Sequence, residues 1–198
     1  IKGIKKNGNK FIKNAIKKGA KIIVSENQKE RLEKKILYLK HKNPRELFAK
    51  FCTQISIKKP NNLIAVTGTN GKSSIANFYY QILKLNKKKA ASIGTLGIYG
   101  INYKKKTFNT TFDSLEINNI LEILKKKKIN NVILEASSHG LKQHRLDGLK
   151  FNIGIFTNLS RDHLDYHKTF KDYFNSKLIL FKKLMKNNSY IIFDNDLK

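Results

Sequence analysis

The sequence has 198 residues, of which 40% are hydrophobic, a fraction that fits a globular chain with a real core. Its formal net charge of +27 is extreme and first suggests nucleic acid or an anionic surface as a partner. We interpret the many lysines as solvated faces and helix ends and expect no nucleic-acid partner. Arginine, the residue suited to bidentate phosphate and base contacts, occurs only at Arg31, Arg45, Arg145 and Arg161. No apolar run reaches the ~18 residues of a membrane span. The single cysteine, Cys52, excludes an intrachain disulfide. We therefore expect a cytoplasmic protein without membrane insertion.

Residues 1–58 predict a small α/β unit. Apolar residues at helical spacing predict a helix over Phe11–Lys18, and apolar runs predict strands at Lys21–Val24 and Ile36–Leu39. Asn43 is placed to cap a helix that begins at Pro44 and runs to about Gln54. We interpret this unit as the remainder of an N-terminal domain whose first strand precedes Ile1.

Residues 59–198 predict strands that alternate with helices. The expected strands are Leu63–Val66, Ala91–Ile93, Val132–Glu135, Ile153–Thr157 and Tyr190–Phe193, and the expected helices are Ile75–Leu85, Ser114–Leu124 and Phe170–Met185. Between them, Asn158–His167 reads as a polar loop. This alternation predicts an α/β fold with a doubly wound, mostly parallel sheet.

The segment Leu63–Ser74 has the layout of a phosphate-binding loop. An apolar strand leads into a glycine turn, which is followed by Lys72, Ser73 and a helix. Such a turn directs backbone N–H groups and a helix N-terminus at phosphate, with the lysine on the phosphates and the serine on Mg²⁺. Val66 departs from the strict G-x-x-x-x-G-K-[ST] pattern, so an ordinary strand-to-helix turn remains an alternative.

Reactive residues follow three of the predicted strands. Glu135 ends one strand, and Asn158–His163 follows another, while Gly68–Ser73 follows the first. Ligands of open α/β sheets bind beyond the carboxyl ends of the strands, so we expect these segments to meet there. Glu135 reads as a Mg²⁺ ligand or, alternatively, as a helix cap or salt-bridge partner, and the loop after the other strand reads as a metal site or as a solvated loop. A Ser-His hydrolase near His139 is disfavoured, since no G-x-S-x-G elbow is present.

Four segments in this order resemble the Mur ligase family, and most closely its MurE branch. They are Thr67–Ser74, Asn109-Thr110-Thr111, Glu135–Gly140 with Gln143 and Arg145, and Thr157–His167. The family uses a shorter Thr-Gly-Thr-Asn-Gly-Lys loop, which accounts for Val66. Phe112 departs from the proline that often follows Asn-Thr-Thr in the family.

The resemblance implies a role for individual residues. The ATP phosphates would be held by Gly68, Thr69, Asn70, Gly71, Lys72, Ser73 and Ser74. The UDP-linked substrate would contact Asn109, Thr110, Thr111, Ser137, Gln143 and Arg145. The Mg²⁺ ligands would be Ser73, Glu135, His163 and Lys177. Lys177 aligns with a lysine that family members carbamylate, and Lys72, Lys177 and His163 would be the catalytic residues.

The implied activity is an ATP-dependent amide ligase of peptidoglycan precursor synthesis. It would add an amino acid, meso-diaminopimelate in preference to L-lysine, to UDP-MurNAc-L-Ala-D-Glu through an acyl phosphate. The alternatives are another superfamily enzyme, such as folylpolyglutamate synthase, or a basic, non-catalytic anion-binding protein. The resemblance also implies a monomer in which residues 59–198 are the first part of a P-loop ATPase domain. A C-terminal domain that binds the amino acid would follow Lys198, so we expect the chain by itself to be inactive.

Overall fold

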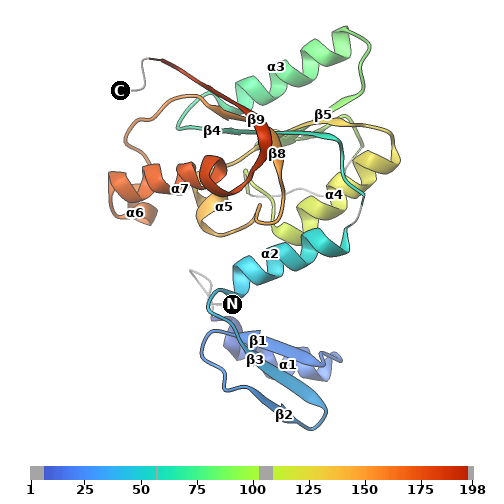
Figure 1. Ribbon diagram of the computed structural model, residues 1–198, viewed down its shortest axis with the longest axis vertical. Helices are drawn as coiled ribbons and strands as arrows, with labels where there is room; N and C mark the ends of the chain where they lie inside the picture. Colours follow the sequence, from blue (N-terminus) through green and yellow to red (C-terminus); the bar gives the residue numbers. More distant parts are fainter. Residues whose placement is uncertain (1–6, 57, 103–108, 196–198) are drawn as a thin grey trace. The chain divides into compact units, whose positions relative to one another are not determined.

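The computed structural model describes residues 7–56, 58–102 and 109–195. Its contacts divide the chain into an N-terminal unit, Ile1–Phe48, and a C-terminal unit, Ala49–Lys198 (Figure 1). The division falls within helix α2 (Pro44–Ile55), ten residues before the boundary expected at residue 58. In the described part of the chain, no helix is both long and apolar enough to cross a membrane.

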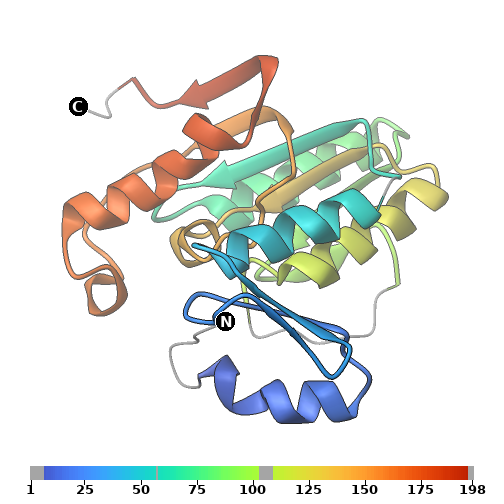
Figure 2. The ribbon, with the colours of Figure 1, turned by 60° about the horizontal axis from the view of Figure 1, so that its bottom comes forward.

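The N-terminal unit is a three-stranded sheet with a helix against one face (Figure 2). Strand β1 (Ile22–Ser25) pairs in parallel with β3 (Ile36–Lys40), and β2 (Arg31–Glu33) pairs antiparallel with the other edge of β3. A 3-10 turn (Gly8–Phe11) leads into α1 (Ile12–Lys17). The predicted helix and both predicted strands are confirmed. Strand β2 was not predicted, because its three residues are all exposed and carry no apolar alternation.

The C-terminal unit is built on a six-stranded sheet with the order β6-β5-β7-β4-β8-β9. Its strands are β4 (Asn62–Thr67), β5 (Ala90–Gly94), β6 (Gly97–Tyr99), β7 (Asn131–Glu135), β8 (Phe151–Phe156) and β9 (Met185–Phe193). Every neighbouring pair is parallel except the β5–β6 hairpin. The predicted mostly parallel α/β sheet is therefore confirmed.

Helices cover both faces of this sheet, as the alternation of side chains along β4 requires. Leu63 and Ala65 join the larger core cluster, which includes buried residues of α4 (Ser114–Lys126) and α7 (Phe170–Lys183). Ile64 and Val66 face the other way, into a smaller cluster with α3 (Lys72–Leu85). Figures 1 and 2 show α3 and α4 on opposite sides of the sheet. This is the doubly wound arrangement.

Two short helices lie in segments where no helix was predicted. Helix α5 (Ser138–Lys142) is capped by Ser137, whose side chain accepts a hydrogen bond from the Gly140 N–H. Helix α6 (Leu164–His167) interrupts the segment that was expected to be a loop. Helices of four or five residues are too short to show an apolar repeat, so periodicity cannot detect them.

The strand order determines where the site forms. From β4 the chain runs to β5 and then β7 on one side, and it later returns to β8 on the other side of β4. The carboxyl ends of β7, β4 and β8 are therefore adjacent at a topological switch point, where open α/β sheets bind ligands. Glu135, the Gly68 loop and Thr157 come directly after, or end, these three strands.

Candidate functional site

The loop between β4 and α3 is closed by a glycine that no other residue could replace without moving its neighbours. Gly68 has a φ of +142°, and a Cβ atom there would lie 1.9 Å from the Thr157 Oγ1 atom. Gly71, at the N-cap of α3, has a φ of +82°. Both positions favour glycine. The backbone can thus approach a bound group closely, as a phosphate-binding loop requires.

The segment after β8 holds this loop in place. The Thr69 N–H donates to the Asn158 carbonyl oxygen at 3.0 Å, and the Asn70 N–H donates to Asn158 Oδ1 at 2.9 Å. The Thr157 hydroxyl donates to the Asn70 carbonyl oxygen at 2.6 Å. The two strand ends that the sequence predicted to converge are therefore directly hydrogen-bonded.

Lys72 folds back over the loop. Its Nζ donates to the carbonyl oxygens of Gly68 and Thr69 at 3.0 and 2.7 Å. Burial lowers the pKa of Lys72, while the negative charges of Glu135 and Asp162 oppose that shift. The lysine thus places a positive charge over the N-terminus of α3, where the partial charge of the helix already favours an anion.

Glu135 is a buried carboxylate held by neutral donors. Its side chain is 3% exposed, and its Oε2 atom accepts from the Ser73 hydroxyl at 2.9 Å. The Thr95 N–H donates to Oε1 at 2.9 Å, and the Thr95 hydroxyl lies 3.1 Å from Oε2. Among the described residues, no lysine or arginine forms an ion pair with it. A buried carboxylate without an ion-pair partner among the described residues, beside a hydroxyl oxygen, is the hard-oxygen donor set that Mg²⁺ prefers, so these residues fit the expected ion.

Lys177 is buried against the same loop from α7. It is 1% exposed, its Nζ donates to the Gly68 carbonyl oxygen at 2.6 Å, and this atom lies 4.3 Å from the centre of the Tyr173 ring. Burial, reinforced by the positive charge of Lys72, lowers the pKa of Lys177 to about 7, against the opposing charge of Asp162. A large fraction of this amine is therefore neutral near physiological pH.

His163 also lies near Tyr173. It is exposed, its backbone has a φ of +52°, and its ring centre is 6.2 Å from that of Tyr173. Its ring packs edge-on against His139 at 4.8 Å, and His139 in turn stacks on Tyr166 at 4.1 Å. The four predicted metal ligands thus form two groups: Ser73 contacts Glu135, whereas Lys177 and His163 both flank Tyr173.

The predicted substrate residues form one connected network next to Glu135. The Thr111 hydroxyl donates to the Glu135 carbonyl oxygen at 2.9 Å and lies 2.9 Å from the Ser137 hydroxyl. Thr110 Oγ1 lies 3.1 Å from Thr95 Oγ1. Asn109 is exposed at the start of this turn, and Ser74 is exposed in the first turn of α3.

Arg145 and Gln143 complete the network on the α5 side. The Arg145 guanidinium donates to Gln143 Oε1 at 2.8 and 3.2 Å and also to the Thr111 carbonyl oxygen. The Gln143 amide donates to the Tyr166 hydroxyl at 3.2 Å. A planar cation is thereby held in one orientation beside the threonine turn, in a position suited to a carboxylate or phosphate.

Three residues of the site were not singled out by sequence reasoning. Thr95 directly follows the carboxyl end of β5. Glu135 was selected because it lies at the carboxyl end of its own strand, β7. Tyr173 bonds the Thr69 hydroxyl at 3.1 Å through its own hydroxyl. His167 is fully buried, with Nε2 2.9 Å from the Ser138 hydroxyl and Nδ1 3.3 Å from the Ser176 hydroxyl. Only the first of these could have been found from its position.

The serine–histidine contact does not create a hydrolase site. Ser138 and His167 are 2% and 0% exposed, so a substrate carbonyl has no access to the hydroxyl. Burial, with a further contribution from the Lys142 charge, lowers the pKa of His167 to about 4. The pair therefore ties α5 to α6 and α7 as a neutral, structural contact.

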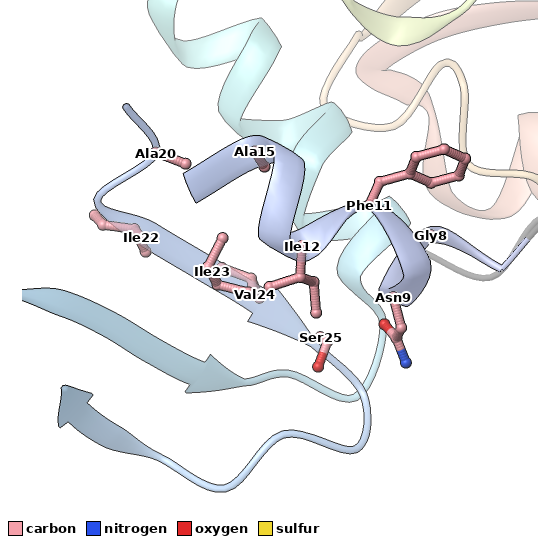
Figure 3. Close-up of a pocket in the computed structure, with 10 residues that line it drawn as sticks. All are labelled: Gly8, Asn9, Phe11, Ile12, Ala15, Ala20, Ile22, Ile23, Val24 and Ser25. Carbon is pink, nitrogen blue, oxygen red and sulfur yellow. The ribbon is translucent and has the colours of Figure 1, made fainter. Parts of the chain in front are cut away.

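A pocket of about 230 Å³ lies in the N-terminal unit between α1 and β1 (Figure 3). Its lining is mostly apolar, and it contains no charged side chain: Gly8, Asn9, Phe11, Ile12, Ala15, Ala20, Ile22, Ile23, Val24 and Ser25. Figure 3 shows Ile12 and Val24 close together between the helix and the strand. Polar groups do not converge there, so we assign it no ligand.

Comparison with known proteins places these features in one family of sequences. The family model described as the Mur ligase middle domain matches residues 66–198. UDP-N-acetylmuramoyl-L-alanyl-D-glutamate–2,6-diaminopimelate ligase of Rickettsia montanensis is 43% identical over 207 residues, which cover 100% of this chain and 42% of the relative. The ligase of the same name from Buchnera aphidicola subsp. Schizaphis graminum is 43% identical over 92% of this chain and 38% of its own length.

The solved structures agree with this result. A UDP-N-acetylmuramoyl-L-alanyl-D-glutamate–2,6-diaminopimelate ligase superimposes with a TM-score of 0.78 at 32% identity, covering 94% of this chain and 37% of that chain. The MurF ligase of Thermotoga maritima in complex with ADP has a TM-score of 0.61 at 20% identity and covers 99% of this chain and 42% of that chain; it shows the fold alone. The chain thus spans about two fifths of the length of the relatives it matches.

Proposed function

Since the chain belongs to the Mur ligase family, we propose that it supplies the ATP site and the UDP-substrate site of an amide ligase of peptidoglycan precursor synthesis. The reaction joins an amino acid to UDP-MurNAc-L-Ala-D-Glu in the cytoplasm, with release of ADP and phosphate. The names of the relatives that are 43% identical favour meso-diaminopimelate as that amino acid.

The observation that carries this proposal is the arrangement around Glu135. Its carboxylate accepts from Ser73 of the phosphate loop, while its backbone carbonyl accepts from Thr111 of the substrate turn. A nucleotide phosphate and the acceptor of that phosphate would therefore meet at one residue. Such an arrangement suits phosphoryl transfer, in which positioning and charge stabilisation supply most of the catalysis.

In the proposed first step, a carboxylate oxygen of D-Glu attacks the γ-phosphorus and the bond to the ADP oxygen breaks. The N–H groups of the Gly68–Ser74 loop and the Lys72 ammonium stabilise the charge that develops on the phosphate oxygens. Arg145, held by Gln143, orients the acceptor substrate beside Thr111. The amine of the incoming amino acid then displaces phosphate from the acyl phosphate and loses a proton.

Mg²⁺ would be held by Ser73 and Glu135, with His163 and carbamylated Lys177 as further ligands, and when bound it neutralises charge on the phosphate oxygens. For Lys177, the neutral amine takes up CO₂ and releases a proton to become a carbamate, which is an oxygen anion. The lowered pKa of the buried Lys177 amine supports this role, because only the neutral form reacts.

Phosphate release by the full-length gene product tests the proposal. The assay contains ATP, Mg²⁺ and UDP-MurNAc-L-Ala-D-Glu, with meso-diaminopimelate and L-lysine offered separately. We expect release that requires the UDP substrate and one of the two amino acids, and no turnover by Lys72→Ala with the fold intact. Release without a need for the UDP substrate, or full activity of Lys72→Ala, would overturn the assignment. Salt-sensitive binding of nucleic acid that does not depend on Lys72 would favour a basic anion-binding protein.

A further inference from the structure

We propose that Thr95 is a positioning residue that orients the Glu135 carboxylate and connects it to the substrate turn through Thr110. Neither the motifs nor the proposed reaction assigns a role to Thr95. The proposal rests on the proposed function, because it concerns the residue expected to hold Mg²⁺.

Thr95 holds both oxygens of the carboxylate. Its backbone N–H donates to Glu135 Oε1 at 2.9 Å, and its hydroxyl donates to Oε2 at 3.1 Å. Two bonds from one residue to the two oxygens fix the plane of the carboxylate as well as its position. The Ser73 hydroxyl, at 2.9 Å from Oε2, is the remaining hydrogen-bond partner of that carboxylate among the described residues. Residues that hold a metal ligand in this way usually set its orientation.

The Thr95 hydroxyl has two acceptors within reach. It is placed to donate either to Glu135 Oε2 or to Thr110 Oγ1, each 3.1 Å away, and a threonine hydroxyl carries only one proton. Glu135 and Thr110 therefore compete for that proton. Since Thr111 of the same turn donates to the Glu135 carbonyl oxygen, the turn contacts this residue at both its side chain and its backbone.

The surroundings leave the carboxylate little freedom to find another orientation. A Cβ atom on Gly94 would lie 2.0 Å from Glu135 Oε1, so the carboxylate packs directly against the backbone of β5. Without the Thr95 hydroxyl, Oε2 keeps only the bond from Ser73, and a buried carboxylate with fewer donors is less well fixed. Its oxygens would then meet a metal ion in a less favourable direction.

The contact between Thr95 and Thr110 couples the binding of the UDP substrate to that of the metal ion. A UDP substrate that donates a hydrogen bond to Thr110 Oγ1 takes the place of the Thr95 hydroxyl there, and so leaves the Thr95 proton for Glu135. Binding of this substrate and binding of the metal ion are therefore coupled, and the coupling must be equal in both directions. Thr95 is the residue through which this coupling passes.

The test uses Thr95→Val and Thr95→Ser in the full-length gene product. Valine keeps the shape and the backbone N–H but removes the hydroxyl, whereas serine restores the hydroxyl. Mn²⁺ binding, measured by electron paramagnetic resonance with a non-hydrolysable ATP analogue, is expected to weaken about tenfold or more in Thr95→Val and to return in Thr95→Ser. Affinity for the nucleotide in EDTA is expected to stay the same in all three proteins.

Two further variants act as controls. Thr53→Val removes a hydroxyl that donates to the Asp147 carbonyl oxygen at 3.3 Å, away from the site, and is expected to bind Mn²⁺ as the wild type does. Thr110→Val leaves Thr95 intact and is expected to abolish the gain in Mn²⁺ affinity that the UDP substrate produces. If Thr95→Val fails to fold, as judged by its thermal transition, Thr110→Val and Thr95→Ser still decide the outcome.

The inference and the proposed function can fail separately. Wild-type ligase activity together with unchanged Mn²⁺ affinity in Thr95→Val would overturn the inference and leave the function standing. Equal weakening in Thr95→Ser and Thr95→Val would also overturn it, because the hydroxyl would then not be the group responsible. Weakened Mn²⁺ binding in Thr95→Val with rescue by serine supports the role of Thr95 at the metal carboxylate even if phosphate release requires a different acceptor.

Discussion

Lys177 and Gly68 are 109 positions apart in the chain, yet the Lys177 Nζ donates a 2.6 Å hydrogen bond to the Gly68 carbonyl oxygen. This bond ties the middle of α7 to the first glycine of the phosphate loop. It also places a buried amine next to the Lys72 ammonium, which donates to the same oxygen. Two lysines on one carbonyl cannot both keep an ordinary pKa in a buried site, and the more deeply buried Lys177 has its pKa lowered to about 7.

This relationship predicts that Lys177 takes up CO₂ near neutral pH. With a pKa of about 7, about nine tenths of the amine is neutral at pH 8, whereas an ordinary lysine with a pKa of ~10.4 is less than about 1% neutral. A carbamate signal in ¹³C NMR with labelled bicarbonate should therefore rise as the pH passes from 6 to 8. The signal should vanish in Lys177→Met and persist in Lys171→Met, which removes an exposed lysine from the same helix. A signal of equal size in Lys177→Met would contradict the prediction.

Gly68→Ala is predicted to abolish nucleotide binding. The new Cβ atom would lie 1.9 Å from Thr157 Oγ1, and the φ of +142° is unfavourable for alanine, so the loop must move. We expect a loss of about 1–3 kcal/mol in the free energy of unfolding from the backbone strain. Isothermal titration with ADP should show binding weakened about tenfold or more, since a displaced loop no longer directs its N–H groups at phosphate.

Gly97→Ala is the matched control for that experiment. Gly97 has a φ of +101°, but a Cβ atom there meets nothing within 4 Å. It should therefore lose similar stability from backbone strain and keep its nucleotide affinity. Equal loss of ADP binding in both variants would mean that general destabilisation, and not the clash with Thr157, is responsible.

The sheet and the phosphate loop could be predicted from the sequence because their residues carry the pattern directly. The apolar runs at Leu63–Val66 and Val132–Glu135 are buried central strands, and the glycine turn after the first run begins a helix. Ligands of open α/β sheets bind beyond the carboxyl ends of the strands, and this rule also predicted that Glu135 and Asn158 lie near the loop. These features are local in the chain, so one segment is enough to indicate each of them.

The contacts that orient the site could not be predicted, because they depend on register and side-chain direction across distant segments. Thr95 is an ordinary threonine in the sequence and becomes relevant only when β5 pairs with β7 and brings it to Glu135. The burial of His167 likewise depends on how α5 and α7 pack. Lysine is so abundant in this chain that Lys177 could be distinguished only by a family resemblance or by its burial.

Glu135→Gln is predicted to preserve the fold and to remove the dependence of nucleotide binding on Mg²⁺. The amide has nearly the same shape and can still accept from the Thr95 N–H and bond the Ser73 hydroxyl, so the thermal transition should shift little. The amide lacks the negative charge that a hard cation requires. Titration with ADP in Mg²⁺ and in EDTA should therefore give equal affinities in the variant and unequal affinities in the wild type.

The matched control for the removal of the Glu135 charge is the variant Glu122→Gln. Glu122 is an α4 carboxylate in an i,i+4 ion pair with Lys126, at 2.8 Å, and lies apart from the loop. An exposed ion pair of this kind contributes little to stability, because water screens the two charges. The variant should keep both its stability and its Mg²⁺ dependence. A Glu135→Gln protein that still binds ADP more tightly in Mg²⁺ would exclude Glu135 as a ligand.

The buried His167 predicts that stability falls in mild acid. Its pKa in the folded protein is about 4, because burial and the Lys142 charge disfavour the protonated form, whereas in the unfolded chain it is ~6.5. Between these values the unfolded state binds more protons, so the free energy of unfolding decreases as the pH falls from 6.5 to 4. From the shift to about 4, this group contributes a decrease of roughly 3 kcal/mol.

His167→Gln isolates this contribution in urea unfolding measured from pH 7 to pH 4. Other charges around the ring also act on the pKa of His167: Asp172 partly opposes its lowering, and His139 and His163 add to it. The useful quantity is therefore the difference in the free energy of unfolding between wild type and variant at each pH. The His167→Gln variant is expected to be less stable than the wild type at pH 7, since the glutamine side chain cannot reproduce both contacts to Ser138 and Ser176. The glutamine binds no proton in this pH range. The difference should thus shrink steadily as the pH falls, and a difference that stays constant would mean that the pKa of His167 is unchanged by folding.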